Sequence, residues 1–257
     1  MEEPKVAPPP VIDPQKRPGM SLLARLLNVF AVPGEVFTEL RFSPHRASNW
    51  LVPAALSAVV GLISVFALLS QPSIQQQFRD RQTRMIEDQI KAGKMTPQER
   101  SVAERFTGPA MLKAVGGAGA VAGSFLSVLW WGFVLWWLGR RMLRVQLAYG
   151  KTLEVAGLAT MIDVLGGLVA MLLMINFGRV GAIPSLAMVV KDFEATRKSP
   201  LFAVIAYVFA FWVVGVRSIG LAKLTDVPYA RAAWLVVTFW MLQQCLFAIL
   251  GLGQLAM

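Results

Sequence analysis

Long apolar runs are the dominant pattern of the chain. Five stretches carry few or no charged residues, and each is close to the ~20 residues that a helix needs to cross a ~30 Å hydrocarbon layer. They cover about Trp50–Leu69, Ala114–Leu138, Ala156–Phe177, Leu201–Leu221 and Ala232–Leu252. The segments between them hold most of the charged residues. The pattern predicts an all-α, polytopic membrane protein built on a bundle of five transmembrane helices.

Two amphipathic helices are predicted ahead of the first span, within residues 21–49. The first has an apolar face of Leu22, Leu23, Leu26, Leu27 and Phe30, and a polar face of Arg25 and Asn28. Pro33 separates it from a second apolar stripe formed by Val36, Phe37 and Leu40. Two arrangements fit this pattern: helices that lie in the headgroup plane with their leucines at the acyl boundary, or helices that pack against the bundle. Residues 1–20, rich in proline and without helical periodicity, are predicted to be a disordered tail.

The long polar segment 71–108 separates the first two spans. Apolar residues recur in its first half at helical spacing, at Ile74, Phe78, Met85, Ile86 and Ile90. Gly93 predicts a helix end, and the capping-box pattern from Thr96 to Glu99 predicts the start of a second helix. We therefore expect an extramembrane helical hairpin within a membrane domain of residues 50–257.

Composition and charge agree with a membrane protein. Hydrophobic residues make up 56% of the chain and charged residues only 16%, with a mean hydropathy of +0.56. The net charge of +10 does not indicate nucleic-acid binding, because the basic residues border apolar runs, where they meet anionic lipid headgroups. Arg140, Arg141, Arg144 and Lys151 crowd one short connector, which predicts that this side, shared with the N-terminus, is cytoplasmic.

The sequence lacks the residue clusters that catalysis or metal binding needs. Its single histidine, His45, and single cysteine, Cys245, exclude a Cys–His pair in sequence proximity and a zinc site built on such ligands. We expect no cofactor. The glycine-rich segment 116–123 lacks the Lys-Ser/Thr ending of a phosphate-binding loop. We interpret Gly119 and Gly123 as a helix-packing pair, with a flexible hinge as the alternative.

Asp163 is the one carboxylate inside a predicted span. An ionisable residue within the membrane is a candidate functional residue by default. The structural interpretation is that Asp163 pairs with Arg217 in the fourth span and so fixes the bundle. Because no second carboxylate or histidine is available for a proton relay, we favour the structural pair.

Several short motifs, in order along the chain, resemble the YIP1 family. They are Ser21–Arg25 leading to Val32–Phe37, the connector Arg140–Arg144 followed by Tyr149–Thr152, and Val227–Ala233. The similarity covers roughly residues 21–252 and suggests a bacterial member. It implies a five-helix membrane domain with a cytosolic N-terminus and no enzymatic activity. Eukaryotic members act in vesicle traffic and contact Rab-type GTPases, but this chain departs from them in its short tail and in the segment 71–108.

The expected function is that of a scaffold or accessory subunit in membrane organisation, lipid handling or transport-complex assembly. Its expected partners are membrane lipids and other membrane proteins, such as an exporter complex, and its expected location is the bacterial inner membrane. The alternative is a small secondary transporter or channel that uses Asp163 within the bundle. Such proteins usually line their route with several polar residues, and few are present here.

Overall fold

The computed structural model describes residues 19–93, 108–180, 182–184 and 207–250. Within these ranges, five helices are long and apolar enough to cross a membrane. They are α3 (Ser48–Leu68), α6 (Pro109–Trp137), α7 (Tyr149–Phe177), α9 (Val208–Thr225) and α10 (Tyr229–Ile249), and a π-helical turn, η2 (Leu138–Met142), extends α6. The prediction of a helical membrane bundle with five spans is confirmed, and the chain is a multi-pass membrane protein.

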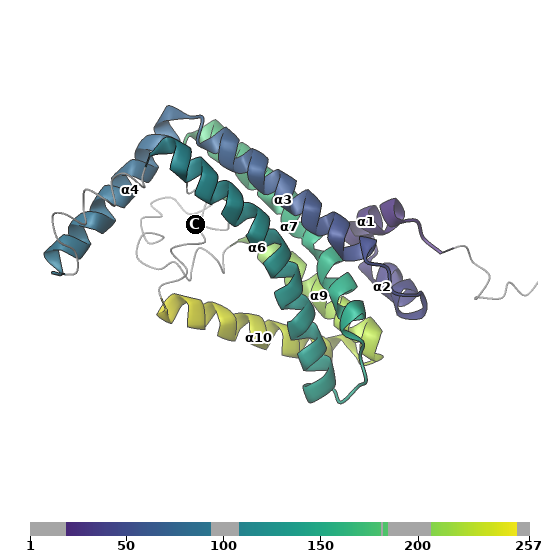
Figure 1. Ribbon diagram of the computed structural model, residues 1–257. Helices are drawn as coiled ribbons and strands as arrows, with labels where there is room; N and C mark the ends of the chain where they lie inside the picture. Colours follow the sequence, from purple (N-terminus) through teal and green to yellow (C-terminus); the bar gives the residue numbers. More distant parts are fainter. Residues whose placement is uncertain (1–18, 94–107, 181, 185–206, 251–257) are drawn as a thin grey trace, which may run out of the picture.

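Three of the spans, α3, α6 and α7, lie side by side and form the centre of the bundle (Figure 1). The start of α3 lies beside the start of α7, because Asn49 of α3 donates a hydrogen bond to Glu154 of α7. Their other ends also meet, because the side chain of Gln71, three residues after α3, donates to the carbonyl of Ile175 near the end of α7. The two helices therefore run in the same direction. Helix α6, which lies between them in the sequence, runs in the opposite direction. This arrangement is that of a chain that crosses a membrane repeatedly.

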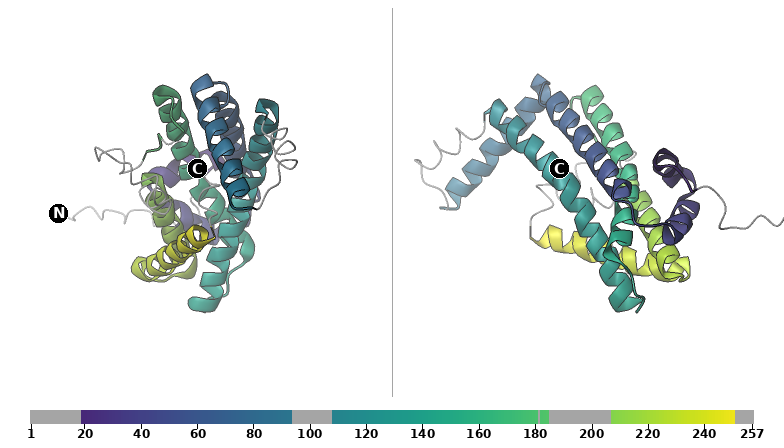
Figure 2. Two further views of the ribbon diagram at one scale, coloured as in Figure 1. Left: turned by 90° about the vertical axis from the view of Figure 1, so that its left-hand side faces the viewer. Right: turned by 45° about the vertical axis from the view of Figure 1, so that its right-hand side comes forward.

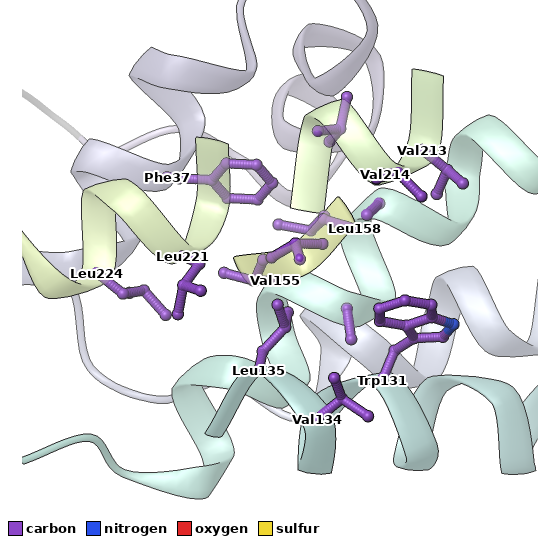
Figure 3. Close-up of a cluster of buried hydrophobic side chains, with 14 of the residues drawn as sticks. Phe37, Trp131, Val134, Leu135, Val155, Leu158, Val213, Val214, Leu221 and Leu224 are labelled. Carbon is purple, nitrogen blue, oxygen red and sulfur yellow. The ribbon is translucent and has the colours of Figure 1, made fainter. Parts of the chain in front are cut away.

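The fourth and fifth spans complete the bundle at one side. Helix α9 packs on α7, and α10 packs on α9 and crosses α6 at a large angle (Figure 2). Buried apolar side chains fill the space where α2, α6, α7 and α9 meet (Figure 3). They include Phe37, Leu135, Val155, Leu158 and Leu221. Burial of this kind fixes the helices relative to one another through close packing.

Two spans have different limits from those predicted by hydropathy. Helix α7 begins at Tyr149 rather than near Ala156, because its charged first turns find partners inside the protein. Helix α9 continues past Leu221 to Thr225, and Asp226 follows it in a left-handed conformation with φ 58°. The predicted start of the fourth span and the last two residues of the fifth lie outside the described residues.

The two N-terminal helices pack against the bundle. Helix α1 (Leu22–Ala31) contacts α7, and α2 (Pro33–Phe42) lies along α9. The packing against the bundle is therefore observed, and the position of these helices at the headgroup plane stays a prediction. The face of α1 that is turned toward the bundle carries Arg25, which is 2% exposed, whereas Leu23 and Leu27 of the predicted apolar face are 65% and 60% exposed. Polar partners inside the protein account for this rotation, because they bind Arg25.

The polar segment after the first span begins with α4 (Pro72–Lys91), which projects away from the bundle (Figure 1). Only Ile74 of this helix is buried. Gly93 follows it with φ +66°, a backbone conformation that glycine adopts without strain, as the predicted helix end requires. The second helix of the predicted hairpin, opened by Thr96, lies outside the described residues, and so does the predicted tail up to residue 18.

Candidate functional site

Asp163 and Arg217 meet between α7 and α9, each far from the ends of its helix. The Arg217 Nη2 atom lies 3.2 Å from Oδ2 of Asp163. The Arg217 side chain is 4% exposed and that of Asp163 is 37% exposed. The structure thus brings together the two ionisable residues that the sequence singled out. In a medium of low dielectric constant, each charge is stabilised chiefly by the other.

A third helix takes part through an aromatic ring. The guanidinium carbon of Arg217 lies 4.2 Å from the ring centroid of Trp131 on α6, within the range of a cation–π interaction. Trp131 is itself buried at 6% exposure and contacts Phe239 of α10 edge-on. Arg217 therefore links α6, α7 and α9 at one level of the bundle, although its Nε atom has no hydrogen-bond partner among the described residues.

A second polar group, which we call the Glu154 cluster, lies at the end of the bundle where α3 and α7 begin. It consists of Arg25, Glu39, His45, Arg46, Asn49, Lys151 and Glu154. The carboxylate of Glu154 is completely buried. Because burial of an unpaired charge is strongly unfavourable, this residue depends on its partners.

The Glu154 carboxylate has four partners. Its Oε1 atom accepts hydrogen bonds from Nδ2 of Asn49 at 3.1 Å and from the backbone N–H of Arg46. His45 Nδ1 lies 3.2 Å from the same oxygen, and Lys151 Nζ lies 3.3 Å from Oε2. The Lys151 ammonium also donates to the carbonyl oxygens of Leu40 and Ser43, each at 2.6 Å. These bonds attach the start of α7 to the end of α2 and the start of α3.

Asn49 connects this carboxylate to the N-terminal helices. Its Oδ1 atom accepts a hydrogen bond from Nη1 of Arg25 at 3.2 Å, while its Nδ2 atom donates to Glu154. Arg25 Nη2 in turn lies 2.9 Å from Oε1 of Glu39. One hydrogen-bonded chain therefore joins α1, α2, α3 and α7, and it contains two cations and two carboxylates.

Sequence reasoning missed the Glu154 cluster. Glu154 was placed in the connector before the third span, and Arg25 on the outer face of the first helix. One signal was present: Lys151 and Glu154 stand at i and i+3 directly ahead of an uncharged run, which is the spacing of a helical ion pair. Extending the predicted helix by two turns would have placed both charges inside it.

The close helix contact predicted at Gly119 and Gly123 lies elsewhere. Among the described residues, no atom lies within 4 Å of the position that a β-carbon would take at either glycine. The contact between α3 and α6 instead uses neighbouring positions, where a β-carbon on Gly61 would stand 3.0 Å from Ala120 Cβ. The small residues on the next face of α6 turn toward α3, so the helix is rotated relative to the prediction.

The Asp163–Arg217 pair and the Glu154 cluster consist of paired charges and not of groups arranged for catalysis. Within the described ranges, no three His, Cys, Asp or Glu side chains gather as metal ligands would. Cys245 lies exposed on α10, far in sequence from the other polar residues singled out here. Both polar groups consist of cations and carboxylates from different helices, and such pairs hold helices together.

Comparison with known proteins gives one match. A family model described as Yip1 domain matches residues 27–252, which is most of the chain. Searches of curated proteins and of solved structures found no match.

Proposed function

Because the chain belongs to the Yip1 family, as the match over residues 27–252 shows, we propose that it is a non-enzymatic scaffold or accessory subunit in its membrane. Its role would be membrane organisation, lipid handling or the assembly of a transport complex. The partners in this proposal are membrane lipids and other membrane proteins, such as an exporter complex. The proposed location is the bacterial inner membrane, with the N-terminus in the cytoplasm.

The observation that carries this proposal is the exposed, charged surface of α4. The helix is attached at its start, where Ile74 is fully buried and Gln77 is hydrogen bonded to the loop after α7. Beyond these residues it presents charged side chains of both signs to its surroundings, namely Arg79, Asp80, Arg81, Arg84, Glu87, Asp88 and Lys91. A rigidly held helix of mixed charge suits the recognition of a complementary protein surface.

The paired charges of the bundle support the same proposal. Asp163 is bound by Arg217, and Glu154 accepts from Asn49, Arg46 and Lys151 and contacts His45, so these carboxylates are engaged within the protein. A bundle fixed in this way can carry α4 at a defined position. Transport or catalysis would need groups that are free to bind or release a substrate.

Replacing residues 79–106 by a short Gly-Ser linker tests the proposal. The replacement keeps Ile74 and Gln77, which hold α4 to the bundle. We expect the tagged native chain to recover a stoichiometric protein partner from crosslinked membranes, and the variant to lose it.

A matched pair of point variants sharpens the experiment. Arg84→Glu reverses an exposed charge on α4, and Arg141→Glu reverses an exposed charge on η2, at another part of the molecule. We expect the first variant to weaken partner recovery and the second to leave it unchanged. Equal recovery by the linker variant and the native chain would contradict the proposal.

The proposed orientation has a separate test. Lys91→Cys and Arg141→Cys, each introduced after Cys245→Ser, place single thiols at exposed positions on the two sides. We expect an impermeant maleimide to label the thiol at position 91 from outside the cell and to reach the one at position 141 only after lysis. Labelling of both thiols in intact cells would overturn the orientation.

The transport alternative rests on the partial exposure of Asp163. Its side chain is 37% exposed although it lies midway along α7. The purified chain in liposomes with a pH-sensitive dye distinguishes the two functions. The scaffold proposal predicts a proton flux no greater than that of protein-free liposomes, whereas a flux abolished by Asp163→Asn would favour transport.

A further inference from the structure

An open hollow lies at the turn between α9 and α10, where these helices meet in Figure 1. Asp226 adopts a left-handed conformation after α9, and Pro228 then precedes the first residue of α10. This reversal of the chain leaves a space of about 540 Å³ beside the last turns of α9. It is lined by Ile219, Ala222, Lys223, Asp226, Val227, Pro228 and Tyr229.

The lining combines an apolar wall with a positive charge. Ile219, Ala222 and Lys223 lie at i, i+3 and i+4, so they share one face of α9, and Asp226 follows directly after the helix. Asp226 is bound to Arg41, whose Nη1 atom lies 3.1 Å from its carboxylate. Lys223 is exposed and makes no salt bridge within the described part of the chain. Arg41 stands outside the lining and neutralises Asp226, so Lys223 supplies the uncompensated positive charge of the hollow.

The position of the hollow is the border of the membrane. It lies just beyond Thr225, the last residue of one span, and at Tyr229, the first residue of the next. Tyr229 is 53% exposed, and Phe42, beside Arg41, is 77% exposed. Exposed aromatic and basic side chains are typical of the headgroup level of a bilayer.

We propose that this hollow binds the headgroup of an anionic phospholipid. Lys223 pairs with the phosphate, Tyr229 offers its hydroxyl group, and the first methylene groups of the acyl chain lie against Ile219 and Val227. A zwitterionic headgroup binds less well, because its own ammonium group is repelled by Lys223 while Asp226 is already paired with Arg41. This inference rests on the proposed function in so far as it names the class of lipid partner.

Native mass spectrometry of the purified full chain tests the proposal. Phosphatidylglycerol and phosphatidylcholine with the same acyl chains are added separately, and the bound lipids are counted. We expect the native chain to retain more phosphatidylglycerol, and Lys223→Gln to lower this retention about fivefold, because one basic residue at an anionic surface contributes an attraction of that order. The matched control Lys91→Gln, an exposed lysine on α4, should behave as the native chain.

Two further measurements assign the cause. Lys223→Arg keeps the positive charge and should therefore keep the preference for phosphatidylglycerol. Retention by this variant shows that the loss in Lys223→Gln comes from the missing charge and not from misfolding caused by any substitution at this position. Inorganic phosphate at millimolar concentration should not displace the lipid; displacement would show a site for free phosphate and overturn the lipid assignment. Equal retention of phosphatidylglycerol by Lys223→Gln and the native chain would also overturn it. Loss of the protein partner in the α4 experiment leaves these lipid measurements unaffected, so the two failures are distinguishable.

Discussion

The Glu154 cluster and the Asp163–Arg217 pair are two solutions to the same problem, a carboxylate inside a membrane protein. Glu154 is fully buried and has four partners, of which Lys151 lies on the same helix and His45, Arg46 and Asn49 lie at the start of α3 or just before it. Asp163 is partly exposed and has one charged partner, which is bound in turn by the face of Trp131. The difference teaches that the first carboxylate organises a junction of four helices, whereas the second supports one contact between neighbouring spans.

The largest effect is expected from Glu154→Leu. The substitution removes the acceptor of the buried Asn49 amide and of the Arg46 backbone N–H, and one of the three acceptors of Lys151. Breaking a buried pair in this way lowers stability by about 3–5 kcal/mol. We expect a lower free energy of unfolding in detergent, and faster protease cleavage in α1 and α2 because their junction with α7 is lost.

Glu154→Gln is the control for this prediction. It retains one acceptor oxygen and nearly the same volume, so its effect should be smaller than that of Glu154→Leu. If both variants unfolded as the native chain does, the carboxylate would not organise the junction, and the comparison would fail.

A smaller effect is expected from Asp163→Asn. The amide oxygen still accepts from Arg217 but the opposite charge is lost, so the variant should be less stable by about 1–3 kcal/mol, the range for hydrogen bonds to charged groups. Thermal unfolding in detergent measures it. Combining it with Arg217→Gln gives a double-mutant cycle, in which the two effects should not add because the residues contact each other.

That cycle also separates the structural role from the functional one. A result in which Asp163→Asn and Arg217→Gln had independent effects would show that their contact contributes nothing to stability. The pair would then lose its structural interpretation, and the partial exposure of Asp163 would regain importance.

The third prediction concerns the glycine nearest to the cluster. A β-carbon on Gly157 would overlap the backbone of Trp50, one helical turn from the hydrogen bond between Glu154 and Asn49. Gly157→Ala should therefore destabilise the chain by about 1–3 kcal/mol through overpacking. We expect thermal unfolding in detergent to show this as a lower midpoint temperature. We also expect a weaker attachment of α1 and α2 to α7.

Gly119→Ala is the matched control on α6. No described atom is near its β-carbon position, so the substitution should be neutral or stabilising by up to about 1 kcal/mol through helix propensity. If Gly119→Ala destabilised the chain as strongly as Gly157→Ala, position 119 would be a packing site after all.

The sequence predicted those features that depend only on the order of residues along the chain. Uncharged runs of sufficient length predicted the five spans, because the bilayer sets the length of a helix that crosses it. The juxtaposition of Asp163 and Arg217 could be anticipated for a similar reason, since an ionisable residue within a membrane requires a partner and few were available.

The rotation of the helices could not be predicted in the same way. Helix α1 has apolar residues around most of its circumference, so its hydrophobic pattern does not decide which face is buried. That choice depends on Arg25 and its acceptors Glu39 and Asn49, which are brought near it only by the tertiary fold. The face of α6 that meets α3 was missed because small residues occur on adjacent faces of that helix.

The attachment of the N-terminal helices has a consequence for biosynthesis. Val36, Phe37 and Leu40 are buried against α9 and its neighbours, and Arg41 binds Asp226, far later in the chain. A ribosome releases the first two helices long before α7 and α9 have been made, since synthesis proceeds at about 5–20 residues per second. This segment is translated before α7 and α9 and therefore reaches its final place only after they have been made, and its apolar surface has to be sheltered by lipid or a chaperone until then.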